Sequence, residues 1–343
     1  MPDPALADLT TLRLGGPARR YVAAPDADAL VAAVSEADAA GEPVLLVGGG
    51  SNLVVADEGF AGTVVHLTGG GVRVEDDACG VTTVTVAAGE PWDDFVARAV
   101  AEGWPGVEAL SGIPGTAGAT PVQNVGAYGQ EVAQTIARVR VWDRVLRGQR
   151  TFTAAECQFA YRHSRFKADP ARHLVLDVTF ELHPGELSTP VAYAELARTL
   201  GVEPGGRAPL ADVREAVLGL RRGKGMVLDA ADHDTWSAGS FFTNPFVEPS
   251  RVPEGAPSYP QADGSVKTSA AWLIEHAGFG KGHGLDRPGA RVSLSTKHTL
   301  ALTNRGGATT AELLDLAREV RDGVRERFGI TLVNEPVLVG ATL

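Results

Sequence analysis

Apolar and polar stretches alternate regularly over the first 70 residues. The pattern over residues 20–24 predicts a strand, and Asp26 is placed to cap a helix over 27–40 whose apolar positions share one face. The apolar run 43–47 predicts a buried strand that leads directly into a glycine-rich loop. Together these elements predict a βαβ-like unit.

Beyond residue 72 the pattern changes to mainly strands, interrupted by one short helix and a second glycine-rich loop. The expected strands are 81–87, 139–143 and 173–182, and the expected helix is 91–102. This part of the chain is therefore expected to be mainly β.

The last third of the chain returns to helical periodicity after a stretch rich in proline and glycine. That stretch, 186–229, predicts an inserted, mobile segment with two short helices and little core of its own. An amphipathic helix is expected over 267–277, and Thr309 with Glu312 forms a capping box for another. Residues 330–339 predict a final strand.

Composition narrows the class of protein without naming it. The 343 residues are 44% hydrophobic and 21% charged, which is typical of a globular protein of about two domains. A net charge of −11 argues against nucleic-acid binding, and no apolar run is long enough to span a membrane. Cys79 and Cys157 are the only cysteines, so we expect no disulfide, no metal site and a cytoplasmic location.

The stretch 237–245, Ser-Ala-Gly-Ser-Phe-Phe-Thr-Asn-Pro, places one serine beside two phenylalanines. In one interpretation Phe241 and Phe242 are the apolar walls of a pocket in which Ser240 is a positioned proton donor. In the other, the stretch is a turn before Pro245 with both phenylalanines in the core. The segment alone favours the turn.

Two glycine-rich loops are candidates for binding a phosphorylated ligand through backbone N–H groups. One is 48–52, after the buried strand, and the other is 111–129, with five glycines in 19 residues. Neither matches G-x-G-x-x-G or G-x-x-x-x-G-K-[ST], so the Rossmann and P-loop interpretations fail. Each loop by itself could equally be a tight turn.

Seven motifs in one order, spread over nearly the whole chain, together resemble the UDP-N-acetylenolpyruvoylglucosamine reductase (UDP-N-acetylmuramate dehydrogenase) family. The longer subtype of that family, with a tyrosine-bearing loop, is the more similar one. The motifs are Gly48-Gly-Gly-Ser-Asn52, Gly112-Ile-Pro-Gly115, Gln123-Asn-Val-Gly-Ala-Tyr-Gly129, Tyr161-Arg-His-Ser-Arg-Phe-Lys167, Ala238-Gly-Ser-Phe-Phe-Thr-Asn-Pro245, Tyr259-Pro-Gln-Ala-Asp-Gly-Ser-Val-Lys267 and Asn334-Glu-Pro336.

The resemblance implies an α+β protein with an FAD-binding fold of the vanillyl-alcohol-oxidase (PCMH) type in two lobes, plus a smaller α+β substrate-binding domain. It implies FAD as cofactor, NADPH as hydride donor, and reduction of the enolpyruvyl ether of UDP-N-acetylglucosamine to UDP-N-acetylmuramate in peptidoglycan synthesis. Small-molecule substrates and a monomeric state are expected. The expected domains are 1–70 (FAD lobe 1, completed by 331–343), 71–185 (FAD lobe 2), 186–229 (inserted substrate loop) and 230–330 (substrate domain).

Site residues follow from the same resemblance. Hydride addition to the vinyl carbon remote from the carboxylate would push charge into an enolate whose oxygens need donors. Arg162 suits that carboxylate, Ser240 would protonate the adjacent carbon, and Glu335 would share a proton or position a donor. Without the resemblance, Arg162 could be a structural ion pair and Glu335 a strand-end charge. The implied FAD contacts are Gly48, Gly49, Gly50, Ser51, Asn52, Ile113, Pro114, Gly115, Gly118, Ala119, Thr120, Val122, Asn124 and Gly126.

Four further positions resemble substrate contacts. Tyr193 and Lys224 resemble residues that hold the diphosphate, and Asn244 and Tyr259 resemble nucleotide-side contacts. Lys224 could instead be a solvated loop charge and Tyr259 a core aromatic. The chain departs from some family members at two positions, which are His298 in place of glutamine and Val337 in place of arginine.

Two other functions remain open at this point. One is a different FAD-dependent oxidase of the same fold, acting on a lactone or an alcohol. The other is a UDP-sugar-binding flavoprotein without catalysis. Arg162, Ser240 and Glu335 together argue against a pure binding protein, because binding needs no proton donor.

Overall fold

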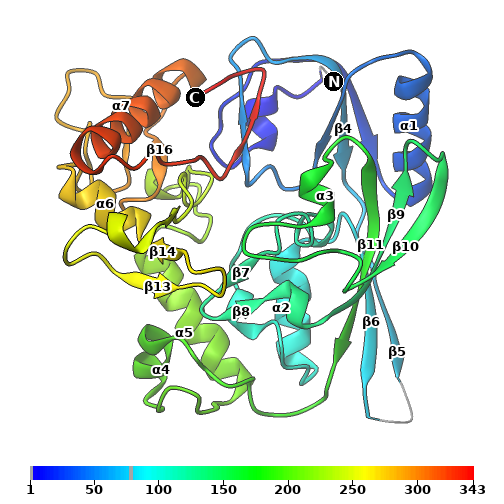
Figure 1. Cartoon of the computed structure of the whole chain (residues 1–343). Helices are drawn as coiled ribbons and strands as arrows, with labels where there is room; N and C mark the ends of the chain where they lie inside the picture. The colour runs from blue at the N-terminus through cyan, green and yellow to red at the C-terminus, as the bar shows by residue number, and fades with distance from the viewer. Residues whose placement is uncertain (1–2, 77–79) are drawn as a thin grey trace. The chain divides into compact units, whose positions relative to one another are not determined.

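A computed structural model describes residues 3–76 and 80–343, and Cys79 lies outside them. The chain divides into two compact units: unit 1 contains residues up to 19, 50–61 and 223–343, and unit 2 contains 20–49 and 62–222 (Figure 1). The α-helices are α1 (Ala27–Ala39), α2 (Trp92–Ala101), α3 (Arg165–Ala168), α4 (Ala194–Leu200), α5 (Leu210–Gly223), α6 (Ala270–His276) and α7 (Thr310–Phe328).

The strands are β1 (Ala18–Ala24), β2 (Val44–Val47), β3 (Leu53–Val55), β4 (Phe60–Leu67), β5 (Val72–Asp76), β6 (Thr82–Ala87), β7 (Gly126–Ala127), β8 (Gln130–Glu131), β9 (Ile136–Asp143), β10 (Gly148–Thr153), β11 (His173–Leu182), β12 (Phe246–Val247), β13 (Ser258–Pro260), β14 (Val266–Thr268), β15 (Val292–Leu294), β16 (Leu302–Asn304) and β17 (Val337–Val339). The longest strand, β11, lies in unit 2.

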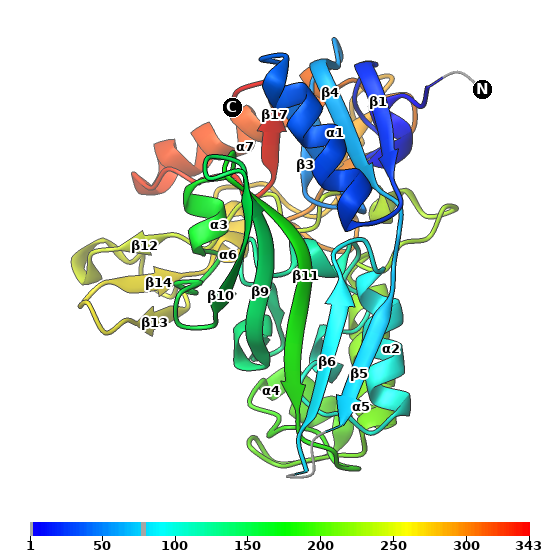
Figure 2. The same cartoon turned by 90° about the vertical axis from the view of Figure 1, so that its right-hand side faces the viewer.

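Unit 2 is built on an antiparallel sheet in the order β10-β9-β11-β6-β5, which Figure 2 shows as a long twisted layer. α2 packs on one face of this sheet, because its apolar side is fully buried against inward-facing residues of the central strands. Phe95 of α2 stacks on Phe180 of β11 with ring centroids 5.1 Å apart. This core supports the second glycine-rich loop, which runs from η2 (Glu108–Leu110) to β8.

The predicted βαβ-like unit is present at the start of unit 2. Asp26 caps α1 by accepting a hydrogen bond from the N–H of Ala29 at 2.8 Å. β2 pairs in parallel with β4 in a three-stranded sheet of order β1-β4-β2, which α1 covers through Leu30 and Val34. β2 then ends at the first glycine-rich loop, as expected.

Unit 1 gathers three separate stretches of the chain around α6 and α7. The capping box of α7 is confirmed: Thr309 accepts a bond from the N–H of Glu312, and the carboxylate of Glu312 accepts one from the N–H of Thr309. β17 pairs in parallel with β3, joining the end of the chain to residues 53–55. Leu313, Leu316 and Val320 of α7 are buried in the core of this unit.

Two predicted elements are shorter in the structure. The helix expected over 267–277 begins at Ala270, because Ser269 caps it and Lys267 lies in β14. The strand expected over 330–339 is regular only in β17. Every helix within residues 3–76 and 80–343 is too short or too polar to cross a lipid bilayer.

The inserted segment, residues 186–229, has more core than the sequence suggests. Leu196, Val213 and Val217 of α4 and α5 are buried together in a cluster with Ala109 of the preceding chain. The expectation of little core is therefore wrong. We expected little core because the segment is rich in glycine and proline, and the apolar side of α5 was not recognised.

Candidate functional site

The start of the first glycine-rich loop lies against the second loop in unit 2. A methyl group on Gly49 would lie 2.6 Å from the Cα of Gly115, and one on Gly48 would collide with the side chain of Thr116. Real Cβ atoms do not approach so closely, so only glycine permits this contact. Segments about 65 residues apart in sequence therefore form one backbone surface.

This surface offers hydrogen-bond donors that the protein itself does not use. Within the described residues, the N–H groups of Gly49, Ile113 and Gly115 donate no hydrogen bond. Gly112 and Gly115 have φ values of +70° and +118°, which turn successive N–H groups outward. Such donors suit the phosphate oxygens of a dinucleotide, so these residues fit the cofactor that the sequence predicts.

Unusual backbone conformations mark the rest of the second loop. Asn124, Tyr128 and Arg162 have φ values of +46°, +50° and +51°, although none is glycine. The side chain of Asn124 fixes its own position, since its Nδ2 donates to Glu131 at 2.7 Å and its Oδ1 accepts from the N–H of Ala133. Strained backbone of this kind concentrates at functional sites.

The other predicted FAD contacts are divided between unit 2 and unit 1. Gly118 packs against Ala88, Thr120 is buried and bonds to the carbonyl of Ala117, and Ala119 is exposed. Pro114, Val122 and Gly126 are half-buried in unit 2. Gly50, Ser51 and Asn52 belong to unit 1, because the division between the units falls after Gly49.

Arg162 lies beside the second loop in unit 2. Its Nη2 donates to the carbonyl of Gly126 at 3.3 Å, and its side chain is half-buried. Lys167 donates to the Arg162 carbonyl at 3.1 Å, which supports the strained backbone. The catalytic role expected of Arg162 stays a prediction, but the residue is held at the predicted flavin loop.

In unit 1 the structure brings the segments of Ser240 and Glu335 together. The N–H of Glu335 donates to the carbonyl of Phe241 at 2.8 Å, and Phe242 forms a β-bridge with Asn334. We call this pairing the Ser240–Glu335 crossing. Within residues 3–76 and 80–343 the hydroxyl of half-buried Ser240 has no hydrogen-bond partner.

Asn52 joins the same crossing, because its carbonyl accepts a hydrogen bond from the N–H of Val337 at 2.9 Å. Its side chain lies near the Glu335 carbonyl, with a long 3.5 Å separation. The end of the first glycine-rich loop is therefore adjacent to two predicted catalytic residues of unit 1.

The phenylalanines beside Ser240 are not pocket walls. Phe241 and Phe242 are each 1% exposed and pack edge to face in the core of unit 1. The alternative interpretation, core aromatics before Pro245, is therefore correct for them. Gly239 has a φ of +70° and no atom within 4 Å of an added Cβ, so there is open space beside its Cα.

The predicted substrate contacts occupy different environments. Tyr193 precedes α4, is 45% exposed and packs edge to face on Tyr128 at 5.4 Å. Tyr259 is 52% exposed in β13, so it is not a core aromatic, and Lys267 lies over its ring at 5.8 Å. Asn244 uses its Oδ1 to accept from the N–H of Ala270 at 2.9 Å.

The remaining positions are in unit 1. Lys224 follows α5 and is half-buried. His298 is half-buried and donates its N–H to Ser295. Val337, where some family members have arginine, is an exposed residue of β17 whose N–H takes part in the strand pairing. The roles of all six substrate and variant positions stay predictions.

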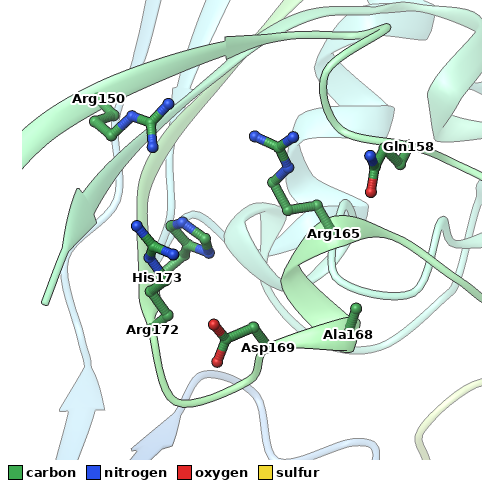
Figure 3. A pocket seen from close by; sticks show the side chains of 7 residues that line it. All are labelled: Arg150, Gln158, Arg165, Ala168, Asp169, Arg172 and His173. Atoms are coloured by element: carbon green, nitrogen blue, oxygen red, sulfur yellow. The ribbon is translucent and has the colours of Figure 1, made fainter. Parts of the chain in front are cut away.

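Unit 2 also has a cavity of about 490 Å³ in which three arginines meet. We call it the arginine pocket, and Figure 3 shows the side chains that line it: Arg150, Gln158, Arg165, Ala168, Asp169, Arg172 and His173.

The cations of the arginine pocket are engaged within the protein. Arg172 donates to the fully buried Asp143 at 2.9 Å, and Arg150 approaches the same carboxylate at 3.6 Å. Arg165 lies over the ring of Phe152. Burial lowers the pKa of His173, and this outweighs the attraction of Asp143. Two of the three arginines therefore face a carboxylate of the protein itself, and we do not assign the pocket as the site.

Comparisons with known proteins identify first the class and then the family. Residues 18–147 match the family model described as FAD binding domain, so the chain is a flavoprotein with FAD as its cofactor. Residues 231–339 match the model described as UDP-N-acetylenolpyruvoylglucosamine reductase, C-terminal domain.

Curated relatives agree over the whole length. The UDP-N-acetylenolpyruvoylglucosamine reductase from Cutibacterium acnes is 61% identical to this chain, over 99% of this chain and 90% of its own length. The reductase of the same name from Thermobifida fusca is 59% identical, over 98% of this chain and 97% of its own length. A crystal structure of UDP-N-acetylenolpyruvylglucosamine reductase from Thermus caldophilus aligns with a TM-score of 0.65 at 26% identity, covering 98% of this chain and 97% of that one. The chain belongs to the UDP-N-acetylenolpyruvoylglucosamine reductase family, and the expected α+β fold class is confirmed.

Proposed function

We propose that this protein reduces UDP-N-acetylenolpyruvoylglucosamine to UDP-N-acetylmuramate for peptidoglycan synthesis, with NADPH as hydride donor. FAD, held by the two glycine-rich loops, would supply hydride transfer from NADPH to the vinyl carbon remote from the carboxylate. One proton must then reach the carbon that bears the carboxylate. The reaction consumes NADPH, one proton and the enolpyruvyl nucleotide, and it releases NADP⁺ and the lactyl ether product.

The Ser240–Glu335 crossing is the observation that best supports this reaction, given the family. It bonds the backbone of Glu335 to that of Phe241, next to Ser240, and leaves the Ser240 hydroxyl without a partner among the described residues. A free hydroxyl held by rigid backbone is what a general acid requires. We assign Ser240 as the proton donor and Glu335 as the residue that positions it.

Arg162 is assigned to the carboxylate of the substrate. A guanidinium can donate two parallel hydrogen bonds to a carboxylate and stabilise the enolate charge as it develops. The flavin contacts are assigned to the donors of the two glycine-rich loops, with Gly49 and Gly115 at their contact. Tyr193 and Lys224 are assigned to the diphosphate, and Asn244 and Tyr259 to the nucleotide.

We further propose that flavin binding and substrate binding belong to different predicted regions. Flavin is bound by 1–70 with 331–343 and by 71–185, and substrate by 186–229 and 230–330. The enzyme is proposed to act in the cytoplasm as a monomer. Cys157 is a buried free thiol, which suits a reducing compartment and supports the cytoplasmic location.

A spectroscopic titration tests the reaction directly. The purified protein should be yellow, bleach when NADPH is added without oxygen, and recover its colour on addition of the enolpyruvyl nucleotide. In heavy water the product should carry one solvent deuterium on the carbon beside the carboxylate. Recovery of colour with oxygen alone, and none with the nucleotide, would instead indicate an oxidase.

A further inference from the structure

Asp93, at the start of α2, contacts both the flavin loop and the inserted segment within unit 2. Its Oδ1 accepts a hydrogen bond from the N–H of Gly112 at 2.6 Å. The same carboxylate accepts two parallel bonds from Arg214 of α5, at 2.7 Å to Oδ1 and 2.9 Å to Oδ2. Paired bonds of this geometry are among the strongest that a protein makes.

The charge state of Asp93 supports this arrangement. Burial raises the pKa of its carboxyl, but the bonds from Arg214 and Gly112 outweigh burial and hold the pKa below its usual value. The buried guanidinium of Arg221, also on α5, lowers the pKa of Asp93 further. Asp93 is therefore ionised at neutral pH, and it would be a poorly compensated anion if α5 moved away.

A second carboxylate, that of Glu108, holds the beginning of the inserted segment. Glu108 is 1% exposed; its Oε1 accepts from the N–H of Thr189 at 2.9 Å, and its Oε2 accepts from the N–H of Gly106. Gln130 also donates to Thr189, at 2.6 Å. None of these bonds involves Gly112, so they anchor the segment independently of Asp93.

We propose that Asp93 is a positioning residue that couples docking of the inserted segment to the affinity of the enzyme for FAD. Asp93 holds Gly112, whose neighbours Ile113 and Gly115 present the open N–H donors, and Arg214 holds Asp93. Loss of Arg214 therefore makes the N–H donors of Ile113 and Gly115 less well positioned for FAD. Because coupling between two sites is reciprocal, FAD bound to these donors stabilises the docked inserted segment. The inference rests on the proposed function, since it takes residues 112–115 as flavin contacts.

Arginine variants of the full-length protein, stripped of flavin and titrated with FAD, measure this coupling. Arg214→Gln should weaken FAD binding by about 5- to 50-fold. Arg214→Lys keeps the charge without the paired bonds and should lie in between. Arg198→Gln is the matched control, because Arg198 is an exposed arginine of α4 in the same segment, and it should bind FAD within about twofold of the parent protein.

The reverse effect is read by limited proteolysis of the inserted segment with and without FAD. FAD should slow cleavage within 186–222 in the parent protein and in Arg198→Gln, and it should give little protection in Arg214→Gln. This readout separates coupling from a loss of stability alone, which would raise cleavage equally in both states.

Three outcomes are distinguishable. A parent protein that binds no FAD would contradict the proposed function itself. Parent-like FAD affinity in both Arg214 variants would overturn the coupling and leave the function intact. Equal weakening in Arg198→Gln and Arg214→Gln would also overturn it, because the effect would then come from charge and not from the contact with Asp93.

Discussion

The arginine pocket of unit 2 and the Ser240–Glu335 crossing of unit 1 use polar side chains in opposite ways. In the pocket, Asp143 is fully buried and its oxygens accept bonds from Arg172 and from the N–H groups that follow it in the turn. At the crossing the backbone carries the bonds, and the Ser240 hydroxyl has no partner in the part of the chain that the structure describes. The pocket therefore uses its charges chiefly within the protein, whereas the crossing leaves one hydroxyl unbonded among the described residues.

Ser240→Ala should show the largest effect, and only on one half-reaction. NADPH should reduce the flavin at a near-native rate, whereas reoxidation by the enolpyruvyl nucleotide should slow by roughly 10²- to 10⁴-fold, the range of general-acid contributions. Stopped-flow absorbance of the flavin separates the two steps.

Ser237→Ala is the matched control, because the Ser237 hydroxyl already accepts a bond from the N–H of Gly239. It should affect stability more than reoxidation. Native reoxidation in Ser240→Ala would contradict the assigned proton donor and make Glu335 or a water the next candidate.

Gly49→Ala should have the second largest effect, because it breaks the contact between the loops. The added methyl group would lie 2.6 Å from Gly115, so the loops must separate. Overpacking of about 1–3 kcal/mol predicts roughly 5- to 150-fold weaker FAD binding. Fluorescence titration of the apoprotein measures it.

Gly148→Ala provides a control in the same unit, since its added methyl would make only an ordinary 3.9 Å contact. FAD binding should be unchanged there. An equal loss in both variants would mean that the loop contact is not the cause.

Asp143→Asn should lower stability by about 2 kcal/mol at neutral pH and leave both half-reactions intact, the converse of Ser240→Ala. Hydrogen bonds from Arg172 hold the pKa of the Asp143 carboxyl well below its usual range, despite the opposing effect of burial. Its contribution is therefore complete above the ordinary carboxyl pKa and is lost as pH falls toward the folded-state value.

Urea unfolding at several pH values tests this sign. The parent protein should lose stability steeply below about pH 4, and Asp143→Asn should lose less over the same interval. Parallel pH profiles would show that Asp143 carries no such linkage.

Tyr193→Phe should give the smallest effect, because it removes a hydroxyl and keeps the ring packed on Tyr128. The KM for the nucleotide should rise by about 3- to 10-fold, the scale of one hydrogen bond, with flavin reduction by saturating NADPH unchanged. Equal losses in both half-reactions would mean that Tyr193 is structural.

Local signals in the sequence predicted the elements well. Asp26 and the Thr309–Glu312 box begin helices where expected, because a cap acts on N–H groups only two or three residues away. The expected strand 173–182 matches β11. The helix expected from 267 missed Ser269, a cap that could have been recognised.

Contacts between distant residues could not be predicted. Asp93 and Arg214 are 121 positions apart and ordinary in type, so nothing in the sequence marks them as partners. The sequence also left the burial of Phe241 and Phe242 undecided, because apolar pocket walls and core aromatics have the same pattern. Only the motif order connected Ser240 with Glu335, and the structure adds the hydrogen bond between their segments.

The parallel pairing of β17 with β3 has a consequence for biosynthesis of the chain. Residues 53–55 leave the ribosome early, but their partner strand at 337–339 is made almost last. Unit 2 lies within residues 20–222 and can fold during translation, whereas unit 1 must wait for the C-terminus. The nascent chain therefore cannot complete the segment that carries Glu335 until synthesis ends.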